Sequence, residues 1–167
     1  MRQIELTQGQ VAIVDEFDYE WLNQWKWHAV KMRGGMKAAR HIPKSGGRKI
    51  YMHRQIMAAP VGMDVDHRDH NTLNNRKENL RVCTTAQNIQ NQLPSRGETS
   101  GFKGVTWDKR DRKWKAYIRI KGRQKFLGYY DDEIEAALVY DTAARRVFKE
   151  FACCNFPQQG REGSERI

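Results

Sequence analysis

Residues 65–91 read VDHRDHNTLNNRKENLRVCTTAQNIQN. The run Val65–His67 is short and ends on two polar residues, as expected for the last part of a strand. A polar loop separates it from a second apolar run, Leu80–Cys83, which has the composition of another strand. Thr84 and Thr85 are both good N-caps for a short helix. The pattern predicts strand, loop, strand and helix.

This order of elements allows several chemically active side chains to converge. Hydrolysis of a phosphodiester bond needs a base that activates water, a cation that stabilises the charged phosphorane, and a group that holds the base. A neutral histidine suits the first task, and His67 supplies one. Carboxylate and amide oxygens suit a hard divalent cation, and Asp66 and Asn88 supply them. Asn79 lies in the loop and is placed to orient His67.

The segment from about residue 51 to residue 91 resembles the HNH endonucleases, specifically the homing-endonuclease branch of phages and introns. The matching segments are MHRQIM (Met52–Met57), VDHRD (Val65–Asp69), NNRKENLR (Asn74–Arg81) and TAQN (Thr85–Asn88). By this resemblance His67 is the general base, and Asn79 orients it through its loop. Asp66 and Asn88 become metal ligands, 22 residues apart as in the short form of the motif. The resemblance implies a ββα-metal fold with Mg²⁺, or alternatively Mn²⁺, as the cofactor.

Two further histidines are accessory candidates. Many relatives have Gly where this chain has His70, so His70 is expected in a turn with positive φ, and an added role near the phosphate stays open. His53, in the segment MHRQI, recurs in this branch, and a structural or DNA-contacting role is favoured over a catalytic one. His28 and His41 are interpreted as scaffold residues.

Cysteine usage argues against structural zinc. The chain has three cysteines, Cys83, Cys153 and Cys154, and no C-x-x-C pair. Many HNH proteins flank their motif with zinc-binding cysteines, so the expected site is the zinc-free form. An odd count with two adjacent members does not make a disulfide framework, and reduced thiols fit an intracellular protein.

The last third of the chain predicts a β-β-β-α unit. Three strand-like runs are followed by a helix that Asp131 or Asp132 caps and that ends near Phe148. The predicted strands are Phe102–Trp107, Trp114–Ile120 and Gln124–Tyr129. Trp114 and Ile118 are expected to face the helix as core. The helix residues at core spacing are Ala136, Ala137, Tyr140, Ala143, Ala144 and Val147.

The predicted sheet is strongly basic, with ten basic and two acidic residues between 102 and 127, whereas residues 131–150 hold six acidic and three basic ones. Such a face suits phosphate contacts and the DNA major groove. Nearly all of residues 101–157 resembles the plant APETALA-type (ethylene-response-factor) DNA-binding domain through FKGV (Phe102–Val105), WKAYIR (Trp114–Arg119), FLGYYDDEIEAALVYDTAARRVF (Phe126–Phe148) and NFP (Asn155–Pro157). The resemblance places DNA contacts on Lys103, Thr106, Tyr117, Arg119, Gln124 and Phe126. A turn of different length makes Trp107, Lys109 and Arg110 additional candidates.

The first 58 residues are interpreted as scaffold. The expected elements are strands Gln3–Leu6 and Val11–Val14, a helix over Asp15–Trp25, a hairpin of Trp27–Met32 with Met36–Ile42 around Gly34-Gly35, and a strand that continues as a helix over Ile50–Ala58. In the helix, Phe17, Leu22 and Trp25 are expected to share one face.

The whole chain of 167 residues is therefore expected to be an α+β protein of two domains. These are an HNH nuclease domain (1–92, with core motif 51–91 and a β-rich extension 1–50) and a DNA-binding domain (101–157, a three-stranded antiparallel sheet on one helix). A linker (93–100) joins them, and a tail (158–167) follows.

A net charge of +10 favours nucleic acid as the partner, and no stretch is long and apolar enough to span a membrane. The expected function is metal-dependent, site-specific cleavage of double-stranded DNA, as a homing-type nickase or double-strand cutter. A monomer is expected, with a homodimer as the alternative, in the cytoplasm of a bacterial or phage-infected cell. The rivals are a DNA-binding regulator with a degenerate nuclease domain and an RNA-directed protein.

Overall fold

The computed structural model describes residues 1–32, 34–43, 46–93 and 99–157. The chain divides into two compact units, residues 1–92 and 93–167. Most of the expected linker and all of the expected tail lie outside the described residues. Both units mix helices with small antiparallel sheets. Among the described residues, no helix has the length and apolar character needed to cross a membrane.

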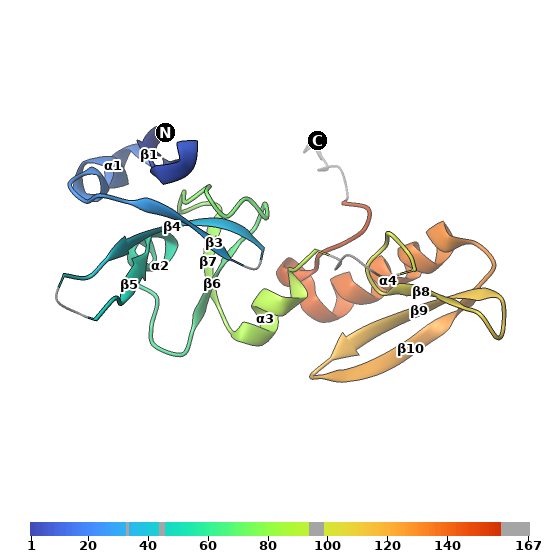
Figure 1. The fold of residues 1–167 in the computed structure, drawn as a ribbon. Helices are drawn as coiled ribbons and strands as arrows, with labels where there is room; N and C mark the ends of the chain where they lie inside the picture. The colour runs from blue at the N-terminus through green and yellow to red at the C-terminus, as the bar shows by residue number, and fades with distance from the viewer. Residues whose placement is uncertain (33, 44–45, 94–98, 158–167) are drawn as a thin grey trace, which may run out of the picture. The chain divides into compact units, whose positions relative to one another are not determined.

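The described residues of the first unit form three small sheets and three α-helices, whose arrangement can be followed in Figure 1. Its elements are β1 (Arg2–Glu5), a 3-10 turn (Thr7–Gly9), β2 (Val11–Val14), α1 (Glu16–Asn23), β3 (His28–Met32), β4 (Gly35–His41), β5 (Lys49–Tyr51), α2 (Met52–Ile56), β6 (Asp64–His67), β7 (Leu80–Cys83) and α3 (Thr85–Gln90). Strand β1 pairs with β2, β4 lies between β3 and β5, and β6 pairs with β7. The expected hairpin, the strand-to-helix transition near residue 51 and the strand-loop-strand-helix order of residues 64–90 are confirmed.

One apolar core joins these elements. Its buried members come from five strands, two helices and the segment before β3: Ile4, Ala12, Val14, Leu22, Trp27, Ala38, Met52, Ile56, Val65 and Leu80. The core therefore contains residues of the N-terminal hairpin as well as residues of β6 and β7. This shared burial fixes the N-terminal scaffold against the strands that carry the motif.

Backbone hydrogen bonds connect the same two regions. Ile13 of β2 donates its N–H to the carbonyl of Leu73 at 2.8 Å, and its own carbonyl accepts the N–H of Asn75 at 2.7 Å. Leu73 and Asn75 belong to the loop between β6 and β7. Strand β2 thus supports that loop directly, in a short parallel bridge between Ile13 and Asn74.

The expected apolar face of the first helix is wrong. Leu22 is fully buried, but Phe17 is 94% exposed and Trp25 is 40% exposed. Helix α1 ends at Asn23, so Trp25 lies beyond it. The second buried position is Asp18, one turn before Leu22, where the side chains of Trp21 and Lys77 both donate hydrogen bonds to its carboxylate. A buried carboxylate, whose Oδ1 accepts both hydrogen bonds, therefore occupies the face predicted to be apolar.

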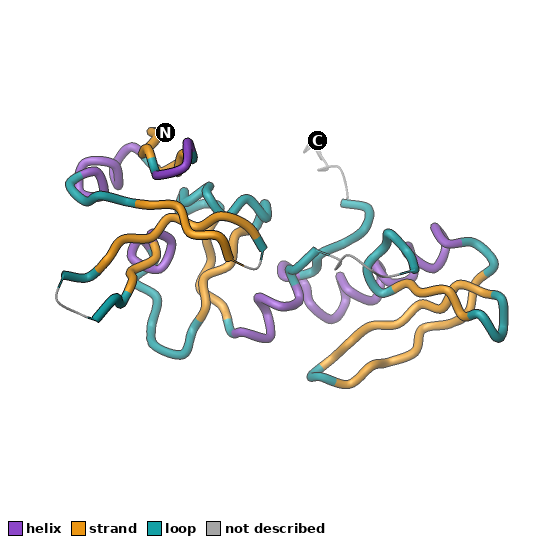
Figure 2. The backbone as a smooth tube through the Cα atoms, viewed as in Figure 1, coloured by secondary structure: helices purple, strands orange, loops and turns teal. Residues whose placement is uncertain are grey.

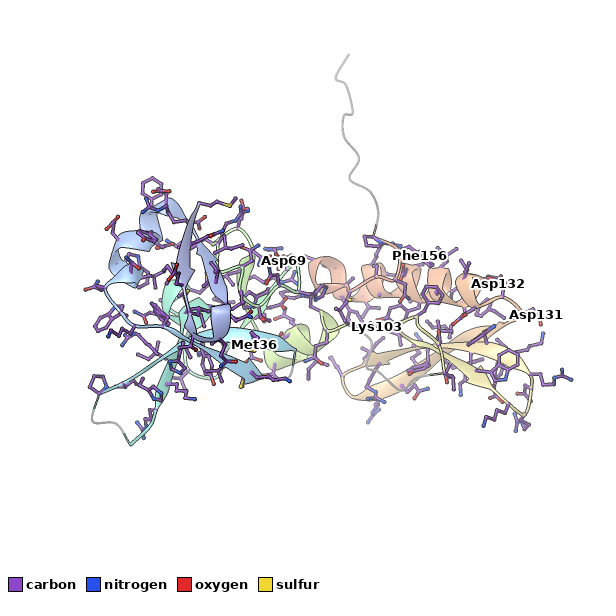
Figure 3. The ribbon with its side chains drawn as sticks, turned by 45° about the horizontal axis from the view of Figure 1, so that its top comes forward. Met36, Asp69, Lys103, Asp131, Asp132 and Phe156 are labelled. Carbon is purple, nitrogen blue, oxygen red and sulfur yellow. The ribbon has the colours of Figure 1, made fainter. Side chains whose placement is uncertain are left out.

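The second unit is a three-stranded sheet covered on one face by a helix (Figure 2). Strands β8 (Val105–Asp108), β9 (Lys113–Ile120) and β10 (Arg123–Tyr130) lie in the order β10-β9-β8, and α4 (Glu133–Phe148) continues into a 3-10 turn (Lys149–Phe151). The predicted β-β-β-α order is confirmed. Asp132 caps α4 by accepting the N–H of Glu135 at 2.8 Å (Figure 3).

The buried face of α4 differs from the expected one at its end. Ala136, Ala137, Tyr140 and Ala144 are buried as predicted, but Val147 is 41% exposed. Phe148 takes the buried position instead, because it lies four residues after Ala144 and eight after Tyr140, on the same side of the helix. As expected, Ile118 is buried, and Trp114 packs partly buried against the same core.

Candidate functional site

Strands β6 and β7 and helix α3 set the framework of the site. The strand register places Asp66 opposite Arg81 and His67 opposite Leu80. Thr84 caps α3 through a capping box: its hydroxyl accepts the N–H of Gln87, and the Gln87 side chain accepts the N–H of Thr84. Thr84 follows the last residue of β7 directly, so α3 begins immediately after the strand. Asn88 of this helix then lies near β6.

His67 is the last residue of β6 and is 4% exposed. Its Nε2 atom is buried and has no hydrogen-bond partner in the described part of the chain. Burial lowers the pKa of His67, and the nearby charge of Lys37 acts in the same direction. The side chain is therefore a neutral imidazole near pH 7, with one nitrogen uncommitted.

His53, from α2, lies beside His67. The two ring centroids are 5.2 Å apart in an edge-to-face arrangement. Burial lowers the pKa of His53 to about 3, with His67 and Lys37 as further causes. The Nδ1 atom of His53 is also buried without a partner in the described residues. The structure thus brings this accessory candidate into contact with His67.

Asn79 stabilises the loop that follows His67. Its amide nitrogen donates to Oδ1 of Asp69 at 2.9 Å and to the carbonyl of Asn74 at 2.8 Å. Its amide oxygen accepts the N–H of Asp69 at 3.0 Å, and its carbonyl accepts the N–H of Arg68 at 2.9 Å. Four hydrogen bonds from one residue fix the chain directly after the histidine.

His70 lies in the same loop and has a φ of 62°, so the expectation of a positive-φ turn is confirmed. Its N–H donates to the carbonyl of His67 at 3.2 Å. The turn therefore reverses the chain immediately after β6 and leads it toward Asn79.

Asp66 is held by two neighbours. Arg81 donates from Nε to Oδ2 of Asp66 at 2.8 Å, and Asn91 donates to Oδ1 at 3.0 Å. The side chains of Asp66 and Arg81 are 6% and 7% exposed. Asn91 also donates to the carbonyl of His67 at 3.1 Å. These contacts fix the direction of the carboxylate and link β6 to the residue after α3.

Asn88 faces a different carboxylate. Its amide nitrogen lies 3.3 Å from Oδ2 of Asp64, which precedes Asp66 by two residues and shares its face of β6. Asp64 and Asn88 line a pocket of about 160 Å³. The other lining residues are Met32, Lys37, Tyr51, His53, Arg54 and Val65. Among the described residues no hydrogen bond joins Asn88 to Asp66, the residue that the sequence predicted to share a cation with it.

The donor atoms are of the type that Mg²⁺ binds, since they are carboxylate and amide oxygens. Among the described residues no group of three His, Cys, Asp or Glu side chains could hold an ion. Mg²⁺ in proteins commonly uses one or two carboxylates, completed by water and substrate phosphates. Asp66 with Asn88, and Asp64 beside them, fit an ion of that kind and do not form an all-protein cage.

Four residues of this site were missed in the sequence. Arg81 and Asn91 hold Asp66, and Asp64 and Lys37 line the pocket. Arg81 follows from the strand register, and Asn91 follows Asn88 by three residues, close to one helical turn. Asp64 lies two residues before Asp66, so the two side chains are expected on the same face of the strand. Lys37 comes from β4, and no local signal in the sequence connects it to residues 64–91.

In the second unit, the strand register gathers many of the predicted DNA contacts on one face of the sheet. Tyr117 pairs with Phe126, Arg119 pairs with Gln124, and Thr106 pairs with Lys115. This face alternates with the buried residues Ala116 and Ile118, so it is the face away from α4. Lys115 and Tyr129 lie on it as well but were not predicted.

The other candidates in this unit lie elsewhere. Trp107 pairs with Trp114, with ring centroids 5.0 Å apart, and so lies on the helix side of the sheet. Lys109 and Arg110 lie exposed in the turn between β8 and β9, and Arg110 forms an ion pair with Asp111 at 2.9 Å. Lys103 precedes β8, where its N–H and carbonyl both bond the side chain of Asn155 (Figure 3).

Comparison with known proteins finds similarity to nucleases and, over a smaller share of the chain, to plant transcription factors. Residues 58–90 match the family model of the HNH endonucleases. An uncharacterized HNH endonuclease of Acanthamoeba polyphaga mimivirus is 30% identical over 153 residues, covering 88% of this chain and 75% of the relative. Protein 3.8 of Escherichia phage T7 is 32% identical over 93 residues, covering 56% of this chain and 76% of the relative.

The chain is also similar to plant proteins over a smaller share of its length. An AP2-like ethylene-responsive transcription factor of Arabidopsis thaliana is 35% identical over 91 residues, covering 46% of this chain and 21% of that protein. The match to the family model coincides with β6, β7 and α3, and the two viral relatives are each covered over about three quarters of their length. The chain belongs to the HNH endonuclease family.

Proposed function

We propose that this nuclease is a divalent-metal-dependent, site-specific endonuclease for double-stranded DNA, of the homing type, that acts on DNA inside the cell. The observation that carries the proposal is His67: a buried, neutral imidazole whose Nε2 has no partner in the described residues and whose following loop is fixed by Asn79. A general base needs an uncommitted nitrogen on a fixed framework, and the unpartnered Nε2 and the Asn79 hydrogen bonds support that role.

In this proposal His67 accepts the proton of the attacking water, and Asn79 acts as the positioning residue of its loop. Asp66 and Asn88 would hold the cation, Mg²⁺ with Mn²⁺ as a substitute. The bound ion supplies charge stabilisation at the phosphate. Arg81 and Asn91 keep the Asp66 carboxylate oriented through the contacts at 2.8 and 3.0 Å. We place these roles in a ββα-metal site formed by β6, β7 and α3.

We further propose that the second unit is an APETALA-type DNA-binding domain that selects the target. Two features support this role: the face away from α4 carries Lys115, Tyr117 and Arg119, and a plant transcription factor is similar to 46% of the chain. Lys103, Thr106, Gln124 and Phe126 are the further proposed contacts, with Lys109 and Arg110 from the neighbouring turn. The described residues of each chain provide one such proposed site, so a monomer is expected to nick and a homodimer to cut both strands.

A plasmid assay tests the catalytic proposal. Supercoiled DNA is incubated with the full chain and Mg²⁺, Mn²⁺ or a chelator, and nicked and linear products are measured. His67→Ala is expected to lose cleavage at least about 100-fold while binding DNA normally, because it removes the base and keeps the basic surface. His70→Gly is the matched control, since glycine accommodates the φ of 62° and leaves His67 in place.

Two outcomes would overturn the proposal. DNA binding without cleavage in any divalent metal would support the rival reading, a regulator with a degenerate nuclease site. A sheet that enters the major groove should bind DNA better than RNA, because the major groove of A-form RNA is too deep and narrow to admit it. Stronger binding to double-stranded RNA than to duplex DNA would therefore contradict the proposal and favour an RNA substrate.

A further inference from the structure

The first unit has a second pocket that the proposed catalytic role does not use. Its volume is about 390 Å³, within the range of small-ligand sites. Its lining comes from the start of the 3-10 turn, the segment between α1 and β3, and the neighbouring ends of β3 and β4. The lining residues are Thr7, Trp25, Lys26, Trp27, His28, Arg40 and His41.

Two histidines form one wall of this pocket. The rings of His28 and His41 stack with centroids 4.7 Å apart and an angle of 13° between their planes. The β3–β4 register explains the contact, because His28 pairs with Ala39 and so lies diagonal to His41. Nε2 of His28 has no hydrogen-bond partner in the parts of the chain that the structure describes. The wall is therefore formed by two stacked, nearly parallel imidazole rings.

The rest of the lining includes an arginine and two tryptophans. The guanidinium of Arg40 lies 4.1 Å from the ring centroid of Trp25 and 5.8 Å from that of Trp27. Its Nε donates to Oε1 of Gln55 at 3.1 Å, and the indole N–H of Trp27 donates to the carbonyl of Leu22 at 2.9 Å. The arginine is thus fixed on an aromatic surface, which reduces the entropy lost when its planar group binds an anion.

The charge of the lining is one-sided. Lys26 and Arg40 are cationic, and none of the seven lining residues is acidic. Lys26 and His41 are exposed, so a ligand can approach from solvent. A guanidinium presents paired N–H groups that match the oxygens of a phosphate, and an ammonium adds a second charge. The chemistry of the pocket therefore suits a phosphate group attached to a small, partly apolar body.

We propose that this pocket binds a backbone phosphate, with its attached nucleoside, of the DNA strand outside the cleavage site. The inference rests on the proposed function, since it takes the same polymer as the ligand. Arg40 and Lys26 contact the phosphate, Trp25 packs against the sugar or base, and the His28–His41 pair closes the site. The N-terminal scaffold thereby contributes a third contact region for DNA, besides the proposed catalytic site and the sheet of the second unit.

Salt-dependent DNA binding tests the proposal. Binding of the full chain to a labelled duplex that contains its cleavage site is measured by anisotropy at several salt concentrations. Lys26→Gln and Arg40→Gln are each expected to weaken binding several-fold at low salt and to lower the slope of log affinity against log salt by about 1. Lys31→Gln is the matched control, since Lys31 is an exposed cation of the same β3 strand outside the pocket.

Equal affinities and slopes for Lys26→Gln, Lys31→Gln and the wild type would overturn the proposal. Lys26 is exposed and its replacement leaves the core intact, so this variant decides the question even if Arg40→Gln fails to fold. Because wild-type cleavage is measured in parallel, unchanged binding by the variants with intact cleavage refutes the pocket alone. Absence of cleavage and of DNA binding by the wild type refutes the proposed function instead.

A second readout identifies the source of the phosphate. The indole N–H signals of Trp25 and Trp27 are followed by NMR while inorganic phosphate, thymidine monophosphate or a short oligonucleotide is added. Shifts of the Trp25 signal with a short oligonucleotide at lower concentration than with the mononucleotide support a polymer site. Tighter binding of the free mononucleotide, with no effect of Lys26→Gln on the duplex, would assign the pocket to a free nucleotide and overturn the proposal.

Discussion

Arg81 and Asp66 form a buried ion pair across the β6–β7 hairpin, with the guanidinium Nε 2.8 Å from Oδ2 of the carboxylate. Both side chains are at least 93% buried, so each charge depends on the other for compensation. The carboxylate proposed to hold the metal is therefore oriented by the protein itself.

Replacing Arg81 with alanine is expected to destabilise the first unit by about 3–5 kcal/mol, because it leaves Asp66 as an uncompensated buried charge. Urea unfolding measures the change. Arg2→Ala is the matched control, since its ion pair with Glu16 at 3.0 Å is exposed and such pairs contribute less than about 1 kcal/mol. Similar small losses for both variants would contradict the importance of the buried pair.

Removing the Asn79 side chain is expected to loosen the loop after His67. Asn79→Ala loses the bonds to Asp69 and Asn74, so the Asp69 amide should exchange its hydrogen faster, as hydrogen-exchange NMR can measure. Because only the base is misplaced, kcat should fall by about 100-fold with little change in KM. Unchanged Asp69 exchange, or a loss confined to KM, would rule out a positioning role.

A methyl group at Gly104 is expected to disrupt the second unit. A Cβ there would overlap the ring of Tyr140 and lie 2.6 Å from the carbonyl oxygen of Tyr117, at a φ of +73°. Gly104→Ala should cost about 3 kcal/mol or more of that unit's stability. Gly101→Ala serves as the control, because nothing lies within 4 Å of its Cβ position and its φ is not positive. Limited proteolysis of the two units separates the effects.

The exposed sheet face is expected to dominate target binding. Arg119→Gln and Lys115→Gln should each reduce affinity for the target duplex and lower the salt slope by about 1. Arg146→Gln removes the same charge from the exposed side of α4 and should have little effect. If Arg146→Gln weakens binding as much as Arg119→Gln does, the helix side of the unit contacts DNA and the proposed orientation is wrong.

Local patterns in the sequence predicted much of the fold. The capping threonine before α3, the alternation along β6 and β9 and the small residues of α4 are all short-range signals, and the corresponding elements form. The first helix was misjudged because periodicity alone does not reveal that Asp18 is buried with Trp21 and Lys77 as partners. Lys77 lies 59 residues further along the chain, beyond the reach of a local pattern.

The candidate site was predictable only in part for the same reason. The motif indicates His67, Asp66, Asn79 and Asn88, but their roles remain proposals. The motif does not reveal Lys37, which comes from β4 and lines the pocket beside Asn88. His53 was named as an accessory candidate, but its contact with His67 became evident only in the structure. Trp107 shows the converse limit, because its strand position was evident but its side of the sheet depends on the register with Trp114.

The hydrogen bonds between Ile13 and the β6–β7 loop limit how the chain can be truncated and how its motif can be transferred between genes. The family model matches residues 58–90, yet the loop inside that match is braced by a strand that ends at Val14. A fragment that starts at residue 51 would leave the amide of Asn75 and the carbonyl of Leu73 without their bonds from Ile13. We therefore expect that recombination which moves the motif to another gene keeps the motif together with the β1–β2 hairpin or with a strand that replaces it.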